Sequence, residues 1–300
     1  MKKMVATLAM FLFAGPALVA AGPCQLSAQA TFQSCEFGTR DAFWLAVAIC
    51  ANDAPPDQRQ ACLGRAREDE KNAMVECREQ NESRLRVCEA LGGGAYVPVI
   101  DPANFVDRVD SAYFPLVPGT TFIYVSHPPE GTERDEVLVT HDTKLILGVT
   151  CTVVRDTVTL NGQLIEDTED WYAQDVNGNV WYFGEEAKQY ENGELIGIEG
   201  TWKAGRDGAQ PGVIIEAKPR VGDLYRQEFL PGTAEDLGKI ASLDESVMVP
   251  YGSFDHCLQT RDFAPLDPGI VEQKFYAPGT GLVLEIDADG TRVELVEVRR

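Results

Sequence analysis

The sequence predicts an α+β multidomain protein, in which a disulfide-stapled antiparallel α-hairpin precedes a mainly antiparallel β domain with one short helix. Three observations lead to this prediction. Six cysteines near the start are spaced symmetrically, three Asn-Gly pairs mark hairpin turns further on, and strand-like segments fill the rest of the chain. We expect a signal peptide over 1–21, the hairpin over 22–91, a linker over 92–104 and the β domain over 105–300.

The first residues have the form of a bacterial signal peptide. Two lysines precede an apolar stretch that ends in Val19-Ala20-Ala21, a small-residue pattern that predicts cleavage after Ala21. A lipid anchor on Cys24 is disfavoured, because Pro23 stands where a lipidation signal requires a small residue. No later segment approaches the roughly 20 apolar residues that cross a bilayer. We expect an exported protein, periplasmic or extracellular, with no transmembrane segment.

The charge of the chain limits its partners. It has 47 acidic and 26 basic residues, for a formal net charge of −21. Such a surface repels phosphate backbones, because nucleic-acid binding depends on Lys and Arg releasing condensed counterions. Nucleic acid is therefore excluded as a partner, and an unidentified protein or small ligand is expected instead.

The spacing of the first six cysteines predicts how they pair. Successive gaps are 11, 15, 12, 15 and 11 residues, which read the same in both directions. Two antiparallel segments folded about Pro55-Pro56 would produce this symmetry, since Pro ends one helix and starts the next. The expected disulfides are Cys24–Cys88, Cys35–Cys77 and Cys50–Cys62.

Both arms of the hairpin are predicted to be helices. At about 100° per residue, gaps of 11 and 15 bring a side chain back to within roughly 20° and 60° of its starting direction. The second arm is rich in helix formers and ends at the strong stop Gly92-Gly93-Gly94. Thiol or metal chemistry is the alternative, but this segment has no Cys-x-x-Cys and no histidine.

The β domain is predicted from its turns. The Asn-Gly pairs at 161–162, 177–178 and 192–193 separate four long strands, 150–160, 163–175, 179–190 and 194–202, in an up-and-down meander. Shorter strands follow at 213–217, 224–229, 246–249, 254–260, 270–276, 281–286 and 291–298, with one helix near 233–241. A barrel, a half-barrel or a sandwich fits this pattern. Cys151 and Cys257 are expected to pair across it.

Two-residue turns at the last two Asn-Gly pairs set a register that brings acids together. One face then carries the core residues Tyr172, Phe183 and Trp202, and the other aligns Glu169, Glu186 and Glu199; three-residue turns would use Glu185 instead of Glu186. An exposed acidic face is one reading of this row. A bound divalent cation such as Ca²⁺ is the other, since hard cations take several oxygen ligands.

Aromatic and catalytic patterns give one more candidate. Trp171 falls on the same face as the glutamate row and is expected to be free to contact a ligand. The three histidines, His127, His141 and His256, stand in no recognisable catalytic motif. We expect a non-enzymatic exported protein that binds a ligand or partner. A carrier of lipid or another apolar ligand in a half-barrel cavity and an exported hydrolase are the alternatives.

Overall fold

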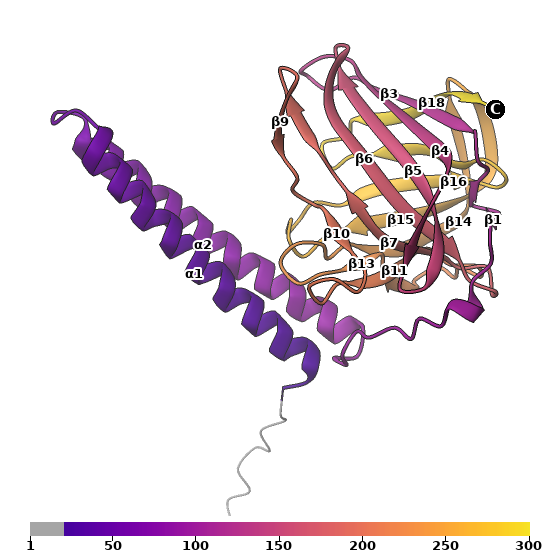
Figure 1. Ribbon diagram of the computed structural model, residues 1–300, viewed down its shortest axis with the longest axis horizontal. Helices are drawn as coiled ribbons and strands as arrows, with labels where there is room; N and C mark the ends of the chain where they lie inside the picture. Colours follow the sequence, from indigo (N-terminus) through magenta and orange to yellow (C-terminus); the bar gives the residue numbers. More distant parts are fainter. Residues whose placement is uncertain (1–20) are drawn as a thin grey trace, which may run out of the picture.

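The structure is a computed structural model that describes residues 21–300. The signal peptide expected over 1–21 lies outside the described residues except for Ala21. Within the described part, a long helical hairpin is joined by an extended linker to a β domain (Figure 1). No helix in residues 21–300 is both long and apolar enough to span a bilayer.

The helical hairpin forms as the cysteine spacing predicts. It consists of α1 (Pro23–Asp53) and α2 (Arg59–Ala90), which extend side by side away from the β domain (Figure 1). The three expected disulfides, Cys24–Cys88, Cys35–Cys77 and Cys50–Cys62, join one helix to the other. Just after α2, Gly92 has a φ of 86°, a conformation that costs glycine little and ends the helix.

Apolar burial within the hairpin is sparse. Large apolar side chains of α1, including Phe37, Trp44 and Ile49, are exposed. Apart from Val87, the buried residues of the two helices are small, sulfur-containing or polar. The full set is Ala28, Cys50, Ala66, Cys77, Ser83, Arg84, Val87 and Cys88. Two helices that bury so little apolar surface need covalent cross-links to stay paired.

The β domain is a long meander preceded by a small hairpin. A 3₁₀ turn (Pro102–Asn104) leads into β1 (Val109–Ser111) and β2 (Phe114–Leu116), which pair with each other. The remaining strands are β3 (Thr121–Ser126), β4 (Glu133–Ile146), β5 (Val149–Leu160), β6 (Gln163–Gln174), β7 (Val180–Glu186), β8 (Gln189–Glu191), β9 (Glu194–Gly197), β10 (Trp202–Lys203), β11 (Gln210–Ile215), β12 (Leu224–Arg226), β13 (Glu228–Phe229), β14 (Leu237–Val249), β15 (Gly252–Phe263), β16 (Glu272–Ala277), β17 (Gly281–Ile286) and β18 (Arg292–Arg299).

The main sheet curls until it is nearly closed into a barrel (Figure 1). The last strand, β18, pairs antiparallel with β3. At the opposite side, β12 pairs with β14 and β13 pairs with β11, so the segment 224–229 joins the two ends of the sheet. Gly212 lies at this seam, where a Cβ atom would overlap the backbone of Gln227, and only glycine allows the strands to approach so closely.

Successive side chains along a strand point to opposite faces of the sheet, and this alternation separates two hydrophobic clusters. Val154 of β5 belongs to the cluster inside the barrel, together with Leu258 and Leu295. The adjacent Val153 points the other way and packs with its cross-strand partner Trp171 in a second cluster. The linker and the loops near Trp202 and Leu230 cover this second cluster, so the outer face of β5 and β6 is partly buried.

The predicted helix near 233–241 is wrong. The segment is a turn followed by the start of β14. Gly232 has a φ of 77° in the turn, and the ring of Tyr225 lies against Gly238, where a Cβ would clash. Glycine inside a helix costs about 1 kcal/mol relative to alanine, whereas here it leaves room for a neighbouring ring. Strands β1 to β4, within 109–146, were not among the strands expected from the sequence.

The predicted pairing of Cys151 with Cys257 is also wrong. Both are buried free thiols. Cys151 lies on β5 in the outer cluster, whereas Cys257 lies on β15 in the cluster inside the barrel. In the sheet, β16, β17, β18, β3 and β4 stand between these two strands. A disulfide requires Cα atoms within about 7 Å, which this separation prevents.

Candidate functional site: an acidic cavity in the barrel

A cavity of about 240 Å³ lies among the inward-facing side chains of the β domain. Strands β3 to β6 form one wall, β16 and β17 contribute to another, and the short β2 strand reaches it through Phe114 and Leu116. Its charged lining consists of four carboxylic acids and one lysine: Asp135, Asp156, Asp170, Glu285 and Lys274. Ionisable groups on the inner face of a barrel are costly to bury and therefore mark a candidate site.

Asp135 and Asp156 form a carboxyl pair on neighbouring strands. Asp156 lies opposite Val137 in the register of β4 and β5, which places it diagonal to Asp135 on the same face. Burial raises the pKa of Asp135 to about 6. Burial, with repulsion from Asp135, holds the pKa of Asp156 well above its usual range. The pair therefore holds a proton more strongly than ordinary carboxyl groups do, and each member has a buried Oδ1 atom without a hydrogen-bond partner in residues 21–300.

Asp170 extends the acidic lining onto β6. The phenol of Tyr182 donates a hydrogen bond of 2.6 Å to Asp170 Oδ1. Burial, together with the charge of Asp156, raises the pKa of Asp170 to about 7. Its cross-strand partner Glu185 is affected in the same way: burial and the charge of Asp170 raise its pKa to about 8. Both groups can release a proton to accommodate a positive charge.

Lys274 balances the acids at one side of the cavity only. Its Nζ lies 3.5 Å from Glu285, 3.6 Å from Glu272 and 3.9 Å from Asp262. Burial alone would lower the pKa of Lys274, but these carboxylates raise it above its usual range. Among residues 21–300, no Lys, Arg or His nitrogen lies within ion-pair distance of Asp135, Asp156 or Asp170. Three acids thus face the cavity without a cation.

Aromatic rings border these acids. Tyr172 stacks on Tyr182 with ring centroids 4.9 Å apart, and Phe114 meets Tyr172 edge-on at 5.2 Å. Tyr276 and Tyr124 also line the cavity, and the Tyr124 hydroxyl donates to the carbonyl of Leu282. Aromatic faces beside carboxylates are the chemistry that proteins use to hold organic cations.

The expected row of glutamates is only partly formed. Glu169 and Glu186 are cross-strand partners, as expected, although the loop between β6 and β7 is longer than the two-residue turn from which this pair was predicted. Lys188 pairs with Glu186 at 2.9 Å. In the same register Asp170 faces Glu185, and a bulge between Asp170 and Tyr172 shifts the pairs nearer the turn by one residue, so that Tyr172 faces Tyr182. Glu199 is exposed in the turn after β9. The three carboxylates expected to bind Ca²⁺ are therefore not brought together, and residues 21–300 contain no cluster of three metal-ligating side chains.

Trp171 is on the predicted face but is not free. Its side chain is 2% exposed, and Lys144 Nζ lies 3.6 Å above the centre of its ring. Residues of the second hydrophobic cluster cover this outer face of β6, which was expected to be open to solvent. The histidines lie apart from the cavity lining, and His256 pairs with Asp244 on an exposed part of the surface.

The positions of the cavity acids along their strands are a sequence signal for an ionisable interior. Asp170 stands two residues before Tyr172 and two after Thr168, both of which the register assigns to the inner face. Asp156 likewise stands two residues after the buried Val154. An acid in phase with core residues on a long strand is the signal that points to an ionisable interior.

Comparisons with known proteins do not identify a function for this chain. No protein-family model matches the chain, and no curated protein matches it. One solved structure is similar, a putative lipoprotein from Parabacteroides distasonis, at 14% identity. The match covers 65% of this chain and 100% of that chain with a TM-score of 0.35, which is too low to support an inference about function.

Proposed function

We propose that this is a non-enzymatic exported binding protein, and that the barrel cavity takes a small organic cation such as an amine or a quaternary ammonium compound. One observation carries the proposal: Asp135, Asp156 and Asp170 face a cavity of about 240 Å³, and no basic side chain of residues 21–300 lies within ion-pair distance of them. An uncompensated buried acid raises the free energy of the folded protein, and a bound cation would remove that cost.

An organic cation fits the lining better than a metal ion. Ca²⁺ needs six to eight oxygen ligands close together, whereas the acids here are spread over several strands and no cluster of three is found in residues 21–300. The rings of Tyr124, Tyr172 and Tyr276 would contact alkyl groups and the face of a diffuse positive charge. A purely apolar ligand, the lipid-carrier alternative, is disfavoured because it would desolvate the acids without neutralising them.

Export is supported by the hairpin. Disulfides persist in oxidising compartments and are rare in the cytosol, and this hairpin depends on three of them. The Sγ atom of Cys24 is bonded to Cys88, so it has no free thiol to accept a lipid. The exposed Phe37 and Trp44 of α1 also favour a role for the hairpin as an interaction module.

Calorimetry with choline and butylamine, against the neutral analogue 3,3-dimethyl-1-butanol and CaCl₂, tests the proposal. We expect saturable binding of at least one of the two organic cations, and no binding of the neutral alcohol or of Ca²⁺. Asp170→Asn should weaken binding at least tenfold, because the amide keeps the bond from Tyr182 but loses the charge. Glu169→Gln, one residue away on the opposite face of β6, is the matched control and should bind normally.

Two results would overturn the proposal. The first is no saturable heat with either organic cation, or equal binding of the alcohol. The second is unchanged binding in both Asp170→Asn and Asp156→Asn, since Asp156 lines the same cavity from the next strand. Circular dichroism of each variant confirms that a loss of binding does not reflect unfolding.

A further inference from the structure

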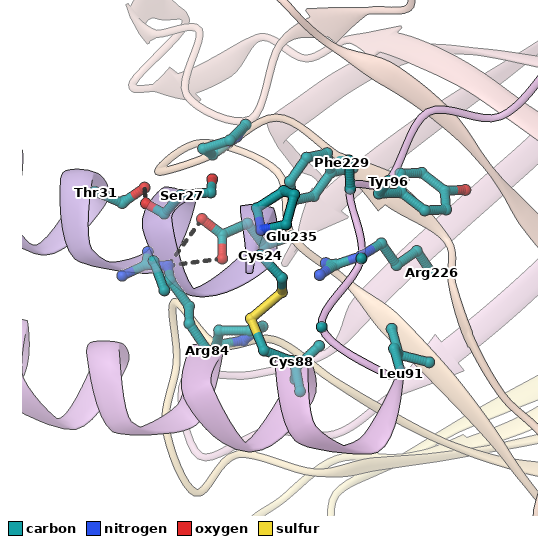
Figure 2. A pocket seen from close by; sticks show the side chains of 18 residues that line it. Cys24, Ser27, Thr31, Arg84, Cys88, Leu91, Tyr96, Arg226, Phe229 and Glu235 are labelled. Atoms are coloured by element: carbon teal, nitrogen blue, oxygen red, sulfur yellow. Dashed lines mark hydrogen bonds and ion pairs between the residues drawn. A yellow bond between two sulfur atoms is a disulfide. The ribbon is translucent and has the colours of Figure 1, made fainter. Parts of the chain in front are cut away.

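A second cavity, of about 300 Å³, lies where the base of the hairpin meets the barrel (Figure 2). The first turns of α1, the end of α2, the linker at 93–96 and the loops of the barrel near Phe229 and Pro265 all contribute to its wall. The disulfide between Cys24 and Cys88 forms part of this wall, so the cross-link helps to hold the cavity in shape. It is separate from the acidic cavity inside the barrel, with which it shares no lining residue.

Arg84 of α2 supplies the first positive group. Its Nε donates to both carboxylate oxygens of Glu235, at 3.0 and 2.8 Å, and its side chain is only 6% exposed. Figure 2 shows this pair at one side of the cavity, with Arg226 at the other. The Nη1 atom of Arg84 is buried and has no hydrogen-bond partner in residues 21–300. A buried guanidinium with an unmet donor is a costly arrangement that a ligand oxygen would relieve.

Arg226 of β12 supplies the second positive group of the cavity. It is 7% exposed, and its guanidinium carbon lies 4.4 Å from the ring centre of Phe229 and 5.6 Å from that of Tyr96. No carboxylate of the described chain lies within ion-pair distance of it. Burial lowers the pKa of Arg226 from its usual range, although the charge of Glu235 partly offsets this. The two rings hold the planar guanidinium in place without neutralising it.

The charges and the apolar wall together define the ligand. The charged lining is two guanidiniums and one carboxylate, which leaves a single net positive charge in a protein whose formal charge is −21. One negative charge would balance it, whereas a doubly charged phosphate would exceed it. The rest of the wall is largely apolar, with Val87, Leu91, Phe229 and Pro231 exposing carbon to the cavity.

We propose that this junction cavity binds a small organic carboxylate, with the carboxylate between Arg226 and Nη1 of Arg84 and an apolar body against Phe229 and Leu91. Guanidiniums pair with carboxylates through two parallel hydrogen bonds, and the buried site would strengthen them. Because helices and barrel both line the cavity, such a ligand also joins the two parts of the molecule.

Calorimetry of the full mature chain with benzoate and hexanoate tests this proposal, with benzamide and inorganic phosphate as comparisons. We expect saturable binding of at least one carboxylate, no measurable binding of benzamide, and weaker binding of phosphate. Arg226→Met should raise the dissociation constant at least tenfold, and since Arg226 has no acidic partner, its loss leaves no acid unpaired. Arg261→Met, at an exposed position on β15, should change nothing.

The proposal is overturned if neither carboxylate binds, if benzamide binds as tightly as benzoate, or if phosphate binds more tightly than both acids. Unchanged benzoate binding in a folded Arg226→Met protein would also overturn it. The benzamide comparison uses the wild-type chain and does not depend on any variant folding. Asp170→Asn should bind benzoate normally, so failure here is distinct from failure of the barrel cavity.

Discussion

Reduction of the three hairpin disulfides should unfold α1 and α2 while the barrel stays folded. The buried residues of the hairpin include little apolar surface, and side chains such as Phe37 and Trp44 contribute almost none. Taken singly, bonds that span 12, 42 and 64 residues restrict the unfolded chain by about 3 to 4 kcal/mol each. Because the loops are nested, these contributions are not additive, yet two helices without them cannot stay paired.

Far-UV circular dichroism with and without reductant measures this effect. The helical signal should fall sharply on reduction, and limited proteolysis should then cut within 23–90 and spare the β domain. The barrel contains its own control, since Cys151 and Cys257 are already free and reductant has no bond to break there. Replacing only Cys50 and Cys62 with serine should have the smallest effect, because that bond closes the shortest loop. Full helicity after complete reduction would contradict the expectation.

Stability should fall as pH rises from 5 to 8. The acids of the barrel have raised pKa values, about 6 for Asp135 and about 7 for Asp170, so the folded protein keeps protons that the unfolded chain has released. Stability is then highest near the ordinary carboxyl pKa of about 4 and declines as pH passes through the folded-state values. We expect the free energy of unfolding to fall by roughly 2–4 kcal/mol between pH 5 and pH 8. The fall is not larger because the cavity leaves these carboxyl groups partly solvated.

The variant Asp156→Asn should reduce this pH dependence. Its amide can donate to Asp135 in place of the protonated carboxyl, and it removes the repulsion between the two acids. Unfolding by urea at pH 8 should show a gain of about 1–2 kcal/mol over wild type. Glu169→Gln, on the outer face of β6, should leave the slope with pH unchanged. A melting temperature that is flat or rising from pH 5 to pH 8 in the wild type would show that the acids are not a source of instability.

The hairpin could be predicted from the sequence because its information is local. The symmetric cysteine spacing, Pro55-Pro56 at the turn and the glycines after α2 all indicate the same structure, and the three bonds form as expected. Charge and spacing do not reveal where the hairpin docks. The buried pair of Arg84 with Glu235 joins residues 151 positions apart, and nothing in either segment marks them as partners.

The β domain was predictable in its strands and less so in its register. Next to the turn at Asn177-Gly178 the pairs, such as Tyr172 with Tyr182, are one residue out of the two-residue register, and a bulge between Asp170 and Tyr172 restores it, so that Glu169 faces Glu186. Such a bulge changes which side chains share a face, and it depends on contacts with strands far along the chain. The glutamate row fails at its third member, because β9 ends at Gly197 and Glu199 lies in the turn beyond it. The buried Trp171 reflects a covering loop whose position the sequence does not reveal.

Closure of the sheet is what creates the cavity, and closure is a non-local property. The pairing of β18 with β3 brings Glu285 and Lys274 to the same space as Asp135 and Asp156, although more than 100 residues separate them. A local pattern shows only that each acid is in phase with core residues on its own strand.

Proton release on cation binding is the most direct test of the barrel cavity. Choline should be titrated calorimetrically at pH 7 in phosphate and in Tris, two buffers with different ionisation enthalpies. A cation beside Asp135, Asp156 and Asp170 lowers their pKa values, so we expect protons to be released and the measured heat to differ between buffers. Asp170→Asn should reduce the difference. Binding with the same heat in both buffers, or with proton uptake, would contradict a cation site among these acids.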